Sequence, residues 1–439
     1  MEPEALARQV IAKLRGAGHQ AYLVGGCVRD LLLGVKPRDF DIATDARPDR
    51  IMDLFPRSGR VGAHFGVVLV RDVFDQVEVA TFRSDHDYVD GRHPEVVRFE
   101  YDPREDVLRR DFTINGLMMD PDDGRVLDYI GGRTDLEHGV IRAIGDPGAR
   151  FREDHLRMMR AIRFAARLGF TIEPATMEAI RRDHALILRV SAERVRDELT
   201  QILTEGGARR GFELLDDSGM LADLLPEVAA MKGVAQPREY HPEGDVWIHT
   251  LLLLEQLGTS GTCSTATLAL GALLHDVGKP PTFRVADRIR FDGHVEEGME
   301  LAEKILNRLR YSRAEIDQVL ALIGCHMKFK DVHRMKESTL KRFLRMPEFE
   351  EHLELHRLDV MSSNRNLENY ELARKKLAEF SVEELKPEPL IGGDELIAAG
   401  YQPGPEFARI LHIVEDAQLE GRIASAGEAM DLVREMFPR

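Results

Sequence analysis

Two glycines followed by an aspartate pair constrain this chain more than any other feature. An apolar run ends at Gly25 and Gly26, a short helix is expected next, and a second strand is predicted to carry Asp39 and Asp41. Side chains two residues apart on a strand point to the same face, so both carboxylates can hold Mg²⁺, which needs hard oxygen ligands. Glycines let backbone N–H groups approach a triphosphate. The stretch therefore suits two-metal phosphoryl or nucleotidyl transfer, and a tight turn with a solvated aspartate pair is the alternative.

A third carboxylate is expected on a neighbouring strand. Residues 61–70 and 76–82 are predicted to be strands joined by a turn. Glu78 is the acid within the second of them, and its side chain points opposite to those of Val77 and Val79. If this strand lies beside the aspartate strand, Glu78 is the third metal ligand. The alternative is an outward-facing strand acid.

A polar segment and an arginine motif follow. Residues 83–94 contain Gly and Pro and are expected to form a mobile loop over the site. Arg109 and Arg110 supply bidentate phosphate donors, and Asp111 and Asn115 are suited to fixing a ribose or the loop. A salt bridge at a helix start is the alternative for this motif taken alone.

From residue 147 the hydrophobic period becomes helical. One helix is predicted over residues 151–168, and Asp154 and Arg157 stand at i and i+3 on its charged face. An acceptor beside donors can read the Watson–Crick edge of A or C, because each carries an exocyclic amine beside a ring acceptor. G and U present the opposite pattern. The alternative is an ordinary ion pair.

These motifs together resemble the polymerase-beta-like nucleotidyltransferases, and more narrowly the class II tRNA nucleotidyltransferase and bacterial poly(A) polymerase family. The resemblance covers about residues 20–205, where five motifs occur in family order, and the segment 109–115 matches the second motif at every position. It implies an α+β fold: a polymerase-beta-like head with a mixed sheet and helices, followed by an all-α neck, an HD body and a helical tail.

The family also implies roles for individual residues. Asp154 and Arg157 would act as a protein template for incoming CTP and ATP, and Arg194 would contact the nucleotide or brace the selecting helix. Ser191 is expected to be the N-cap of the helix that carries Arg194. The remaining residues expected to bind nucleotide, chiefly at the triphosphate, are Gly25, Gly26, Arg29, Arg110, Asp111, Asn115 and Arg160.

The second half carries a constellation of histidines and aspartates on separate segments. One histidine on an apolar helix is usually a core residue, but this set resembles the ligands of the HD phosphohydrolase superfamily. Neutral imidazoles with carboxylates suit Ni²⁺, Mn²⁺, Fe or Zn²⁺ with open positions for water. The resemblance implies phosphatase or 2′,3′-cyclic phosphodiesterase activity. The predicted ligands are His249, His275, Asp276, His294, His326 and Asp359.

Length and charge bound the organisation of the chain. With 439 residues it is too long for one core. The expected domains are a catalytic head, a helical neck with the nucleotide-selecting motif, an HD-type domain and a helical tail, over residues 1–140, 141–225, 226–375 and 376–439. The net charge of −16 argues mildly against nucleic-acid binding, yet arginines crowd between 142 and 210. These arginines predict either a basic stripe that follows a phosphate backbone or helices whose arginines form ion pairs with acidic residues.

The sequence predicts a cytoplasmic protein without a membrane partner. The first residues lack a basic, apolar signal pattern, no apolar run approaches the ~20 residues of a membrane helix, and Cys27, Cys263 and Cys325 have the spacing of free thiols. The expected state is a monomer or homodimer.

The expected reaction is template-independent addition of C and A from CTP and ATP to the tRNA 3′ end, with two Mg²⁺. An A-adding enzyme or a poly(A) polymerase is the alternative. A CC-adding enzyme is disfavoured because such relatives lack or shorten the loop that residues 83–94 supply. An alternative of another class is an HD hydrolase whose head is only a nucleotide sensor.

Overall fold

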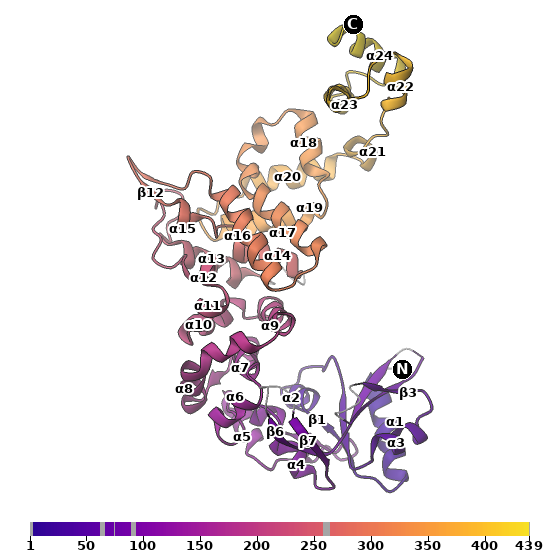
Figure 1. The fold of residues 1–439 in the computed structure, drawn as a ribbon, viewed down its shortest axis with the longest axis vertical. Helices are drawn as coiled ribbons and strands as arrows, with labels where there is room; N and C mark the ends of the chain where they lie inside the picture. The colour runs from indigo at the N-terminus through magenta and orange to yellow at the C-terminus, as the bar shows by residue number, and fades with distance from the viewer. Residues whose placement is uncertain (1–2, 62–65, 74, 89–93, 258–263, 439) are drawn as a thin grey trace. The chain divides into compact units, whose positions relative to one another are not determined.

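A computed structural model describes residues 3–61, 66–73, 75–88, 94–257 and 264–438. The chain divides into two compact units, Met1–Ala229 and Ala230–Arg439, and Figure 1 labels many of their elements. Among the described residues, no helix combines the length and the apolarity needed to cross a membrane. Cys27 and Cys325 are free thiols, and Cys263 lies outside the described residues. The boundaries of the four expected domains stay a prediction.

The first unit begins with an α+β head, as expected from the sequence. Its sheet has the strand order β3-β4-β5-β2-β1-β8-β9. The elements are α1 (Pro3–Gly16), β1 (Ala21–Val24), α2 (Gly26–Leu32), β2 (Asp41–Thr44), α3 (Pro48–Leu54), β3 (Ser58–Val61), β4 (Val67–Arg71), β5 (Gln76–Thr81), β6 (Arg83–Tyr88), β7 (Pro94–Phe99), α4 (Pro103–Leu108), a 3-10 turn (Thr113–Asn115), β8 (Met118–Met119), β9 (Val126–Leu127), α5 (Gly132–His138) and β10 (Val140–Ile141).

The pairing of β2 with β5 is parallel, whereas the other named pairs of this sheet are antiparallel. Asp41 lies opposite Glu78, and Ile42 lies opposite Val79. Ile42, Ala43, Val77 and Val79 are buried, whereas Glu78, which points to the opposite face of β5 from the two valines, is exposed. This register brings the predicted third carboxylate beside the aspartate strand.

The segment 83–94 corrects one expectation. It was predicted to be a mobile loop, but β6 and β7 form an antiparallel hairpin, with Arg83 opposite Phe99 and Tyr88 opposite Pro94. Residues 89–93 between the strands lie outside the described residues. The polar composition suggested a loop, but the hydrogen bonds between two strands are made by backbone groups. Polar side chains therefore do not prevent a hairpin from forming.

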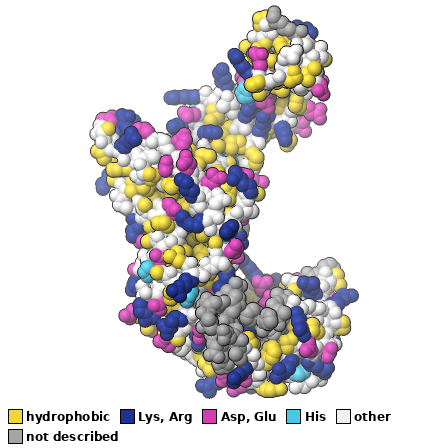
Figure 2. Space-filling model, in the orientation of Figure 1, with side chains coloured by type: hydrophobic (Ala, Val, Ile, Leu, Met, Phe, Trp, Pro, Cys, Tyr) yellow, Lys and Arg dark blue, Asp and Glu magenta, His cyan; other side chains and the backbone are white. Residues whose placement is uncertain are grey.

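The neck continues the first unit with helices. Its elements are α6 (Pro147–Glu153), α7 (Arg157–Leu168), β11 (Thr171–Ile172), α8 (Pro174–Asp183), a 3-10 helix (His184–Arg189), α9 (Ala192–Thr204), α10 (Ala208–Asp217), α11 (Met220–Leu224) and α12 (Pro226–Ala229). Arginines here form ion pairs with Asp and Glu, among them Arg163 with Glu198 at 2.7 Å and Arg181 with Asp217 at 2.5 Å. This pattern favours the ion-paired alternative over a bare basic stripe. Figure 2 likewise shows Lys and Arg interspersed with Asp and Glu on the displayed face.

Among the described residues of the second unit, the named elements are helices apart from one small hairpin. Its elements are α13 (Val246–Gln256), α14 (Ala266–Leu274), α15 (Lys279–Thr282), β12 (Arg284–Val285), β13 (Ile289–Arg290), α16 (His294–Arg308), α17 (Arg313–Cys325), a 3-10 helix (His326–Arg334), α18 (Glu337–Leu344), α19 (Phe349–Met361), α20 (Glu368–Glu379), α21 (Val382–Leu385), α22 (Gly393–Ala398), α23 (Pro405–Leu419) and α24 (Ala426–Met436). The tail was expected to be helical, and α23 and α24 lie in it.

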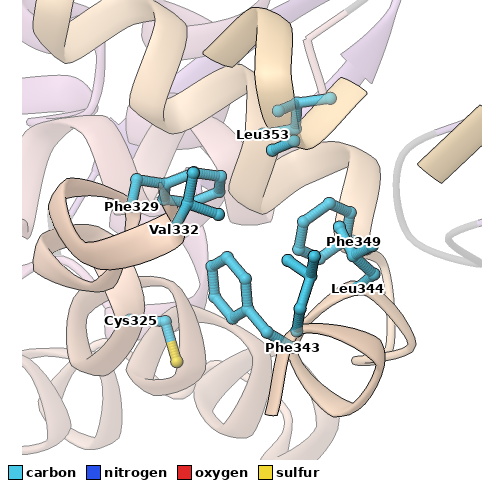
Figure 3. Packing of buried hydrophobic residues seen from close by; sticks show 9 residues of the cluster. Cys325, Phe329, Val332, Phe343, Leu344, Phe349 and Leu353 are labelled. Atoms are coloured by element: carbon cyan, nitrogen blue, oxygen red, sulfur yellow. The ribbon is translucent and has the colours of Figure 1, made fainter. Parts of the chain in front are cut away.

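An aromatic cluster holds the middle of the second unit together. Phe329, Phe343 and Phe349 are buried, and Figure 3 shows their rings converging with Val332, Leu344 and Leu353. Phe329 and Phe343 meet edge to face with ring centroids 4.9 Å apart. Such pairs add about 0.5–1.5 kcal/mol beyond the area they bury. The cluster fixes α19, the helix that also carries Asp359.

Candidate functional site

The glycine turn between β1 and α2 is required by a close approach. Gly25 has φ 75°, and a Cβ there would lie 3.1 Å from Arg110 Nη1 and 3.9 Å from Asp41 Oδ2. A side chain would meet both the left-handed backbone penalty and the guanidinium. Glycine therefore lets Arg110 and Asp41 share the space in front of the turn.

The three predicted metal carboxylates gather at this turn. Asp41 opens β2, and Glu78 is its partner on β5. Asp39 precedes the strand instead of lying on it, so the expectation of an i, i+2 strand pair is wrong in detail, because β2 begins at Asp41. Burial, with the charges of Glu78 and Asp39, raises the pKa of Asp41 to about 6, although Arg110 opposes the rise. Clustered carboxylate oxygens are a donor set that fits divalent cations.

A cavity of about 520 Å³ opens beside these carboxylates. It is lined by every residue that the sequence predicted for the head and neck sites except Glu78: Gly25, Gly26, Arg29, Asp39, Asp41, Arg110, Asp111, Asn115, Asp154, Arg157, Arg160 and Arg194. Arg109, the other predicted phosphate donor, lines it as well. Residues that sequence reasoning missed also line it, among them Arg38, Phe164, Arg167 and Glu205. The cavity wall is therefore rich in guanidinium groups, which suit a polyphosphate.

A hydrogen-bonded chain connects the head to α7 along the cavity wall. Arg160 donates from Nε and Nη2 to Asp111 Oδ2 at 2.9 and 2.7 Å. Asn115 donates to Asp111 at 3.1 Å and accepts from Arg29 at 2.8 Å. Burial would raise the pKa of Asp111, but Arg160 outweighs it and holds the pKa at about 2. Asp111 and Asn115 thus fix the arginines that face the cavity.

The predicted helix over 151–168 is interrupted at the selecting motif. Asp154 is extended, with φ −145° and ψ 107°, and its Oδ1 accepts a hydrogen bond from the backbone N–H of Leu156 at 3.1 Å. This side-chain turn ends α6 and starts α7 at Arg157, so Asp154 and Arg157 do not share a helical face. Both nevertheless reach the same cavity.

Each member of the selecting pair has its own support. Arg194 donates to Asp154 from Nη1 at 3.2 Å and from Nη2 at 2.8 Å. Arg157 donates to Glu153 at 2.7 Å and to the carbonyl oxygen of Arg109 at 3.1 Å. Ser191 occupies the N-cap position of α9, as expected, but its side chain makes no capping hydrogen bond.

Phe164 organises three of the arginines. The guanidinium carbons of Arg29, Arg160 and Arg163 lie 5.2, 5.3 and 4.3 Å from its ring centroid. Cation–π contacts of this kind are worth about 0.5–2 kcal/mol each. The sequence shows Phe164 only as one apolar residue of a helical stripe, so nothing in the pattern identified this role.

A second cluster lies inside the second unit, where all six predicted HD residues meet. Their ligand atoms form two trios, each within 4.8 Å: His249 with His275 and Asp359, and Asp276 with His294 and His326. The trios join at Asp276, whose Oδ2 lies 3.1 Å from His275 Nε2 and whose Oδ1 lies 4.0 Å from His294 Nε2.

The histidines of this cluster are held in one tautomer. His275, His294 and His326 place Nδ1 at 3.0, 2.9 and 2.6 Å from backbone carbonyl oxygens. A carbonyl only accepts, so Nδ1 carries the proton and Nε2 presents its lone pair to the cluster. This second-shell pattern is typical of metal-binding histidines. The donor set of imidazoles and carboxylates therefore fits divalent metal ions.

Sequence reasoning missed further members of the cluster: Glu243, which pairs with both His241 and His249, and Lys279. Glu243 Oε1 lies 2.7 Å from His249 Nδ1, while Asp359 Oδ1 lies 3.1 Å from His249 Nε2. Burial alone would lower the pKa of His249, but these carboxylates raise it to about 9. Lys279 Nζ lies 2.7 Å from Asp276 Oδ2. Lys279 stands three residues after Asp276, and this spacing could have identified it from the sequence. No sequence pattern pointed to Glu243.

Three family models match successive parts of the chain. Residues 21–142 match the poly A polymerase head domain, 169–232 the probable RNA and SrmB-binding site of polymerase A, and 245–362 the HD domain. Fold, cavity and buried cluster thus define a nucleotidyltransferase head and neck followed by an HD domain, a combination that implies dependence on divalent metal. The chain belongs to the tRNA nucleotidyltransferase and poly(A) polymerase family, in the type that carries an HD domain.

Individual relatives are CCA-adding enzymes. That of Lactobacillus johnsonii is 40% identical over 257 residues, which are 57% of this chain and 63% of that enzyme. That of Bacillus subtilis is 44% identical over 218 residues, 50% of this chain and 55% of that enzyme. The chain therefore matches somewhat over half the length of these curated relatives. The crystal structure of the Bacillus stearothermophilus CCA-adding enzyme in complex with CTP has a TM-score of 0.77 and 27% identity, covering 99% of both chains.

Proposed function

We propose that this protein adds C and A from CTP and ATP to the 3′ end of tRNA without a nucleic-acid template. The observation that carries the proposal is the cavity that joins clustered carboxylates to an arginine-rich wall. The names of its relatives support the same activity.

The chemistry assigns roles to the residues around the cavity. Asp39, Asp41 and Glu78 would hold two Mg²⁺, which supply Lewis-acid charge at the α-phosphate when bound. The tRNA 3′ oxygen forms a bond to the α-phosphorus, the bond to the bridging oxygen breaks, pyrophosphate leaves and the hydroxyl proton passes to solvent. Gly25, Gly26, Arg29 and Arg110 bind the triphosphate.

Base choice falls to Asp154 and Arg157. Asp154 accepts from the exocyclic amine of C or A, and Arg157 donates to the adjacent ring acceptor. Arg194 holds Asp154 by two hydrogen bonds, which supports bracing as its role. Asp111 and Asn115 position Arg160 and Arg29.

The test uses purified protein, Mg²⁺ and tRNA transcripts that end in the discriminator base, in CC or in CCA. Each receives CTP, ATP or both, and products are sized at single-nucleotide resolution. Addition of CCA followed by arrest supports the proposal. Extension of the CC end alone by one A indicates an A-adding enzyme, a long A tail indicates a poly(A) polymerase, and no extension favours a nucleotide sensor.

The HD cluster supports a second activity, metal-dependent hydrolysis of phosphate esters such as 2′,3′-cyclic ends. Water adds to phosphorus, one ester bond breaks, and the freed hydroxyl takes the proton. Ni²⁺, Mn²⁺, Fe or Zn²⁺ suits the donors, and two trios of ligands accommodate one or two ions. Chelator dialysis followed by an assay of 2′,3′-cyclic nucleotides with added Ni²⁺ tests it, and absence of hydrolysis contradicts it. A cytoplasmic location and a monomeric or homodimeric state stay predictions.

A further inference from the structure

The hairpin of β12 and β13 separates two parts of the buried HD cluster. Before it, α15 begins at Lys279, whose Nζ lies 2.7 Å from Asp276. After it, α16 begins at His294. Figure 1 shows the hairpin projecting from the helices of its unit. We call residues 283–291 the arm.

Aromatic contacts fix the base of the arm to the cluster. The rings of Phe283 and Phe291 lie 5.9 Å apart, and Lys279 Nζ lies 5.4 Å from the Phe291 ring centroid. The carbonyl oxygen of Phe291 also accepts from His294 Nδ1 at 2.9 Å. The base of the arm is therefore held against residues of the cluster, while the residues at its turn are exposed.

The arm carries three arginines and one aspartate. Arg284 lies directly opposite Arg290 in the ladder, and like charges in that position destabilise a pair of strands. Arg290 binds Asp287 at 2.9 Å. Arg284 and Arg288 are exposed and form no ion pair with any described residue. An anionic partner would remove this unfavourable arrangement.

The cluster is less buried at His294 and Asp359 than at its centre, and His294 is the residue next to the arm. The side chains of His249, His275 and Asp276 are at most 2% exposed, whereas those of His294 and Asp359 are 13% and 22% exposed. His294 follows the arm directly in the chain. A molecule that enters at His294 therefore passes the base of the arm.

We propose that the arm binds single-stranded RNA whose 3′-terminal phosphate occupies the HD cluster. Arg284 and Arg288 bind upstream phosphates, because guanidinium groups pair with phosphate oxygens in two-pronged geometry. Phe283, 38% exposed, offers a ring on which a base can stack. A substrate that uses both the cluster and the arm carries more than one phosphate, so RNA fits better than a mononucleotide. The proposal rests on the hydrolase activity proposed above.

The experiment compares two substrates with the full-length protein and Ni²⁺. One is a short single-stranded RNA ending in a 2′,3′-cyclic phosphate, and the other is cyclic 2′,3′-CMP. For Arg284→Ala with Arg288→Ala, we expect kcat/KM on the RNA to fall about tenfold and kcat/KM on the mononucleotide to stay unchanged. The slope of log kcat/KM on RNA against log salt concentration should become shallower by about 1.4, at roughly 0.7 per lost phosphate contact. Arg434→Ala, an exposed arginine of α24, is the matched control.

Other outcomes separate the two proposals. If the double variant hydrolyses RNA as fast as the unmodified protein, or loses kcat/KM equally on both substrates, the proposal that the arm binds RNA is wrong. If the unmodified protein hydrolyses neither substrate, the hydrolase proposal fails, and fluorescence anisotropy with a 3′-phosphorylated RNA decides the arm. Binding then weaker in the double variant than in Arg434→Ala supports it, and equal binding overturns it.

Discussion

Arg194 binds Asp154 through both terminal nitrogens, at 3.2 and 2.8 Å. Asp154 stands between two helices, so its carboxylate is positioned by this arginine and by the backbone N–H of Leu156. The orientation of the proposed base-selecting group therefore depends on α9, a helix nearly 40 residues further along the chain.

Arg194→Ala should weaken the choice of base more than the rate of transfer. Without its partner, Asp154 loses a charge-assisted pair worth about 1.5 kcal/mol, which is roughly tenfold in selectivity. We expect the ratio of CTP to UTP incorporation to fall about tenfold in single-nucleotide addition assays. Arg196→Ala on the same helix, which removes an exposed pair with Asp197, is the control. Equal loss of CTP and UTP incorporation would contradict the bracing role.

Neutralising Asp41 should lower kcat more than neutralising Glu78. Asp41 faces the cavity and lies in register with Glu78 on the parallel strand, whereas Glu78 does not line the cavity. Asp41→Asn should lower kcat on the order of 10³-fold, since bound metal supplies several kcal/mol. Glu78→Gln should cost about 10- to 100-fold and raise the Mg²⁺ concentration for half activity.

The control is Asp53→Asn, an exposed carboxylate on α3 of the same unit, which should leave kcat unchanged. Wild-type kcat and Mg²⁺ dependence in Glu78→Gln would make Glu78 an outward-facing strand acid, the alternative considered from the sequence.

Local pattern predicted most of the cavity because its chemistry resides in short motifs. Gly25, Asp41 and Arg110 each lie in a motif, and the strand period indicated where Glu78 points. The break at Asp154 was not predicted because the residues around it continue a helical apolar stripe, and a side-chain turn overrides that stripe. Likewise the β6–β7 hairpin depends on backbone pairing, which the polar sequence conceals.

The HD cluster shows the same division. Its six predicted ligands carry recognisable residue types, and the helices bring them together. Glu243 lies in an irregular segment before α13 and reaches His249 only in the folded chain. Phe164 was visible as a core residue, but its contacts with three arginines depend on tertiary packing.

Two buried histidines should make the second unit sensitive to acid. His352 and His356 lie on α19, no described residue hydrogen-bonds their ring nitrogens, and His356 stacks on Phe329 at 4.3 Å. Burial lowers the pKa of each from 6.5 to about 4. The unfolded chain therefore binds these protons first, so stability is complete above pH 6.5 and is lost as pH falls toward 4. The loss approaches about 3 kcal/mol per histidine, at 1.36 kcal/mol per pKa unit.

Urea unfolding followed by Trp247 fluorescence measures this, because Trp247 is the single tryptophan and is buried in the second unit. His356→Phe should remove about half of the fall in the free energy of unfolding between pH 6.5 and 4, because His352 still contributes its share. His412→Phe, whose side chain is 60% exposed on α23, should leave the dependence unchanged. A profile for His356→Phe as steep as that of the unmodified protein would mean that His356 is not buried in its neutral form.

Glu243→Gln should weaken metal binding in the HD cluster without unfolding the protein. Glu243 Oε1 lies 2.7 Å from His249 Nδ1, and this negative charge beside Nδ1 leaves Nε2 to face the cluster. Glutamine keeps the size and an acceptor oxygen but removes the charge, so His249 becomes a poorer ligand. Loss of such a partner costs about 10- to 100-fold in metal affinity. Isothermal titration with Ni²⁺ measures the affinity, and the melting temperature of the metal-free protein reports on the fold. Glu239→Gln, an exposed glutamate nearby in the sequence, should change neither quantity. Unchanged affinity in Glu243→Gln would show that Asp359 alone orients His249.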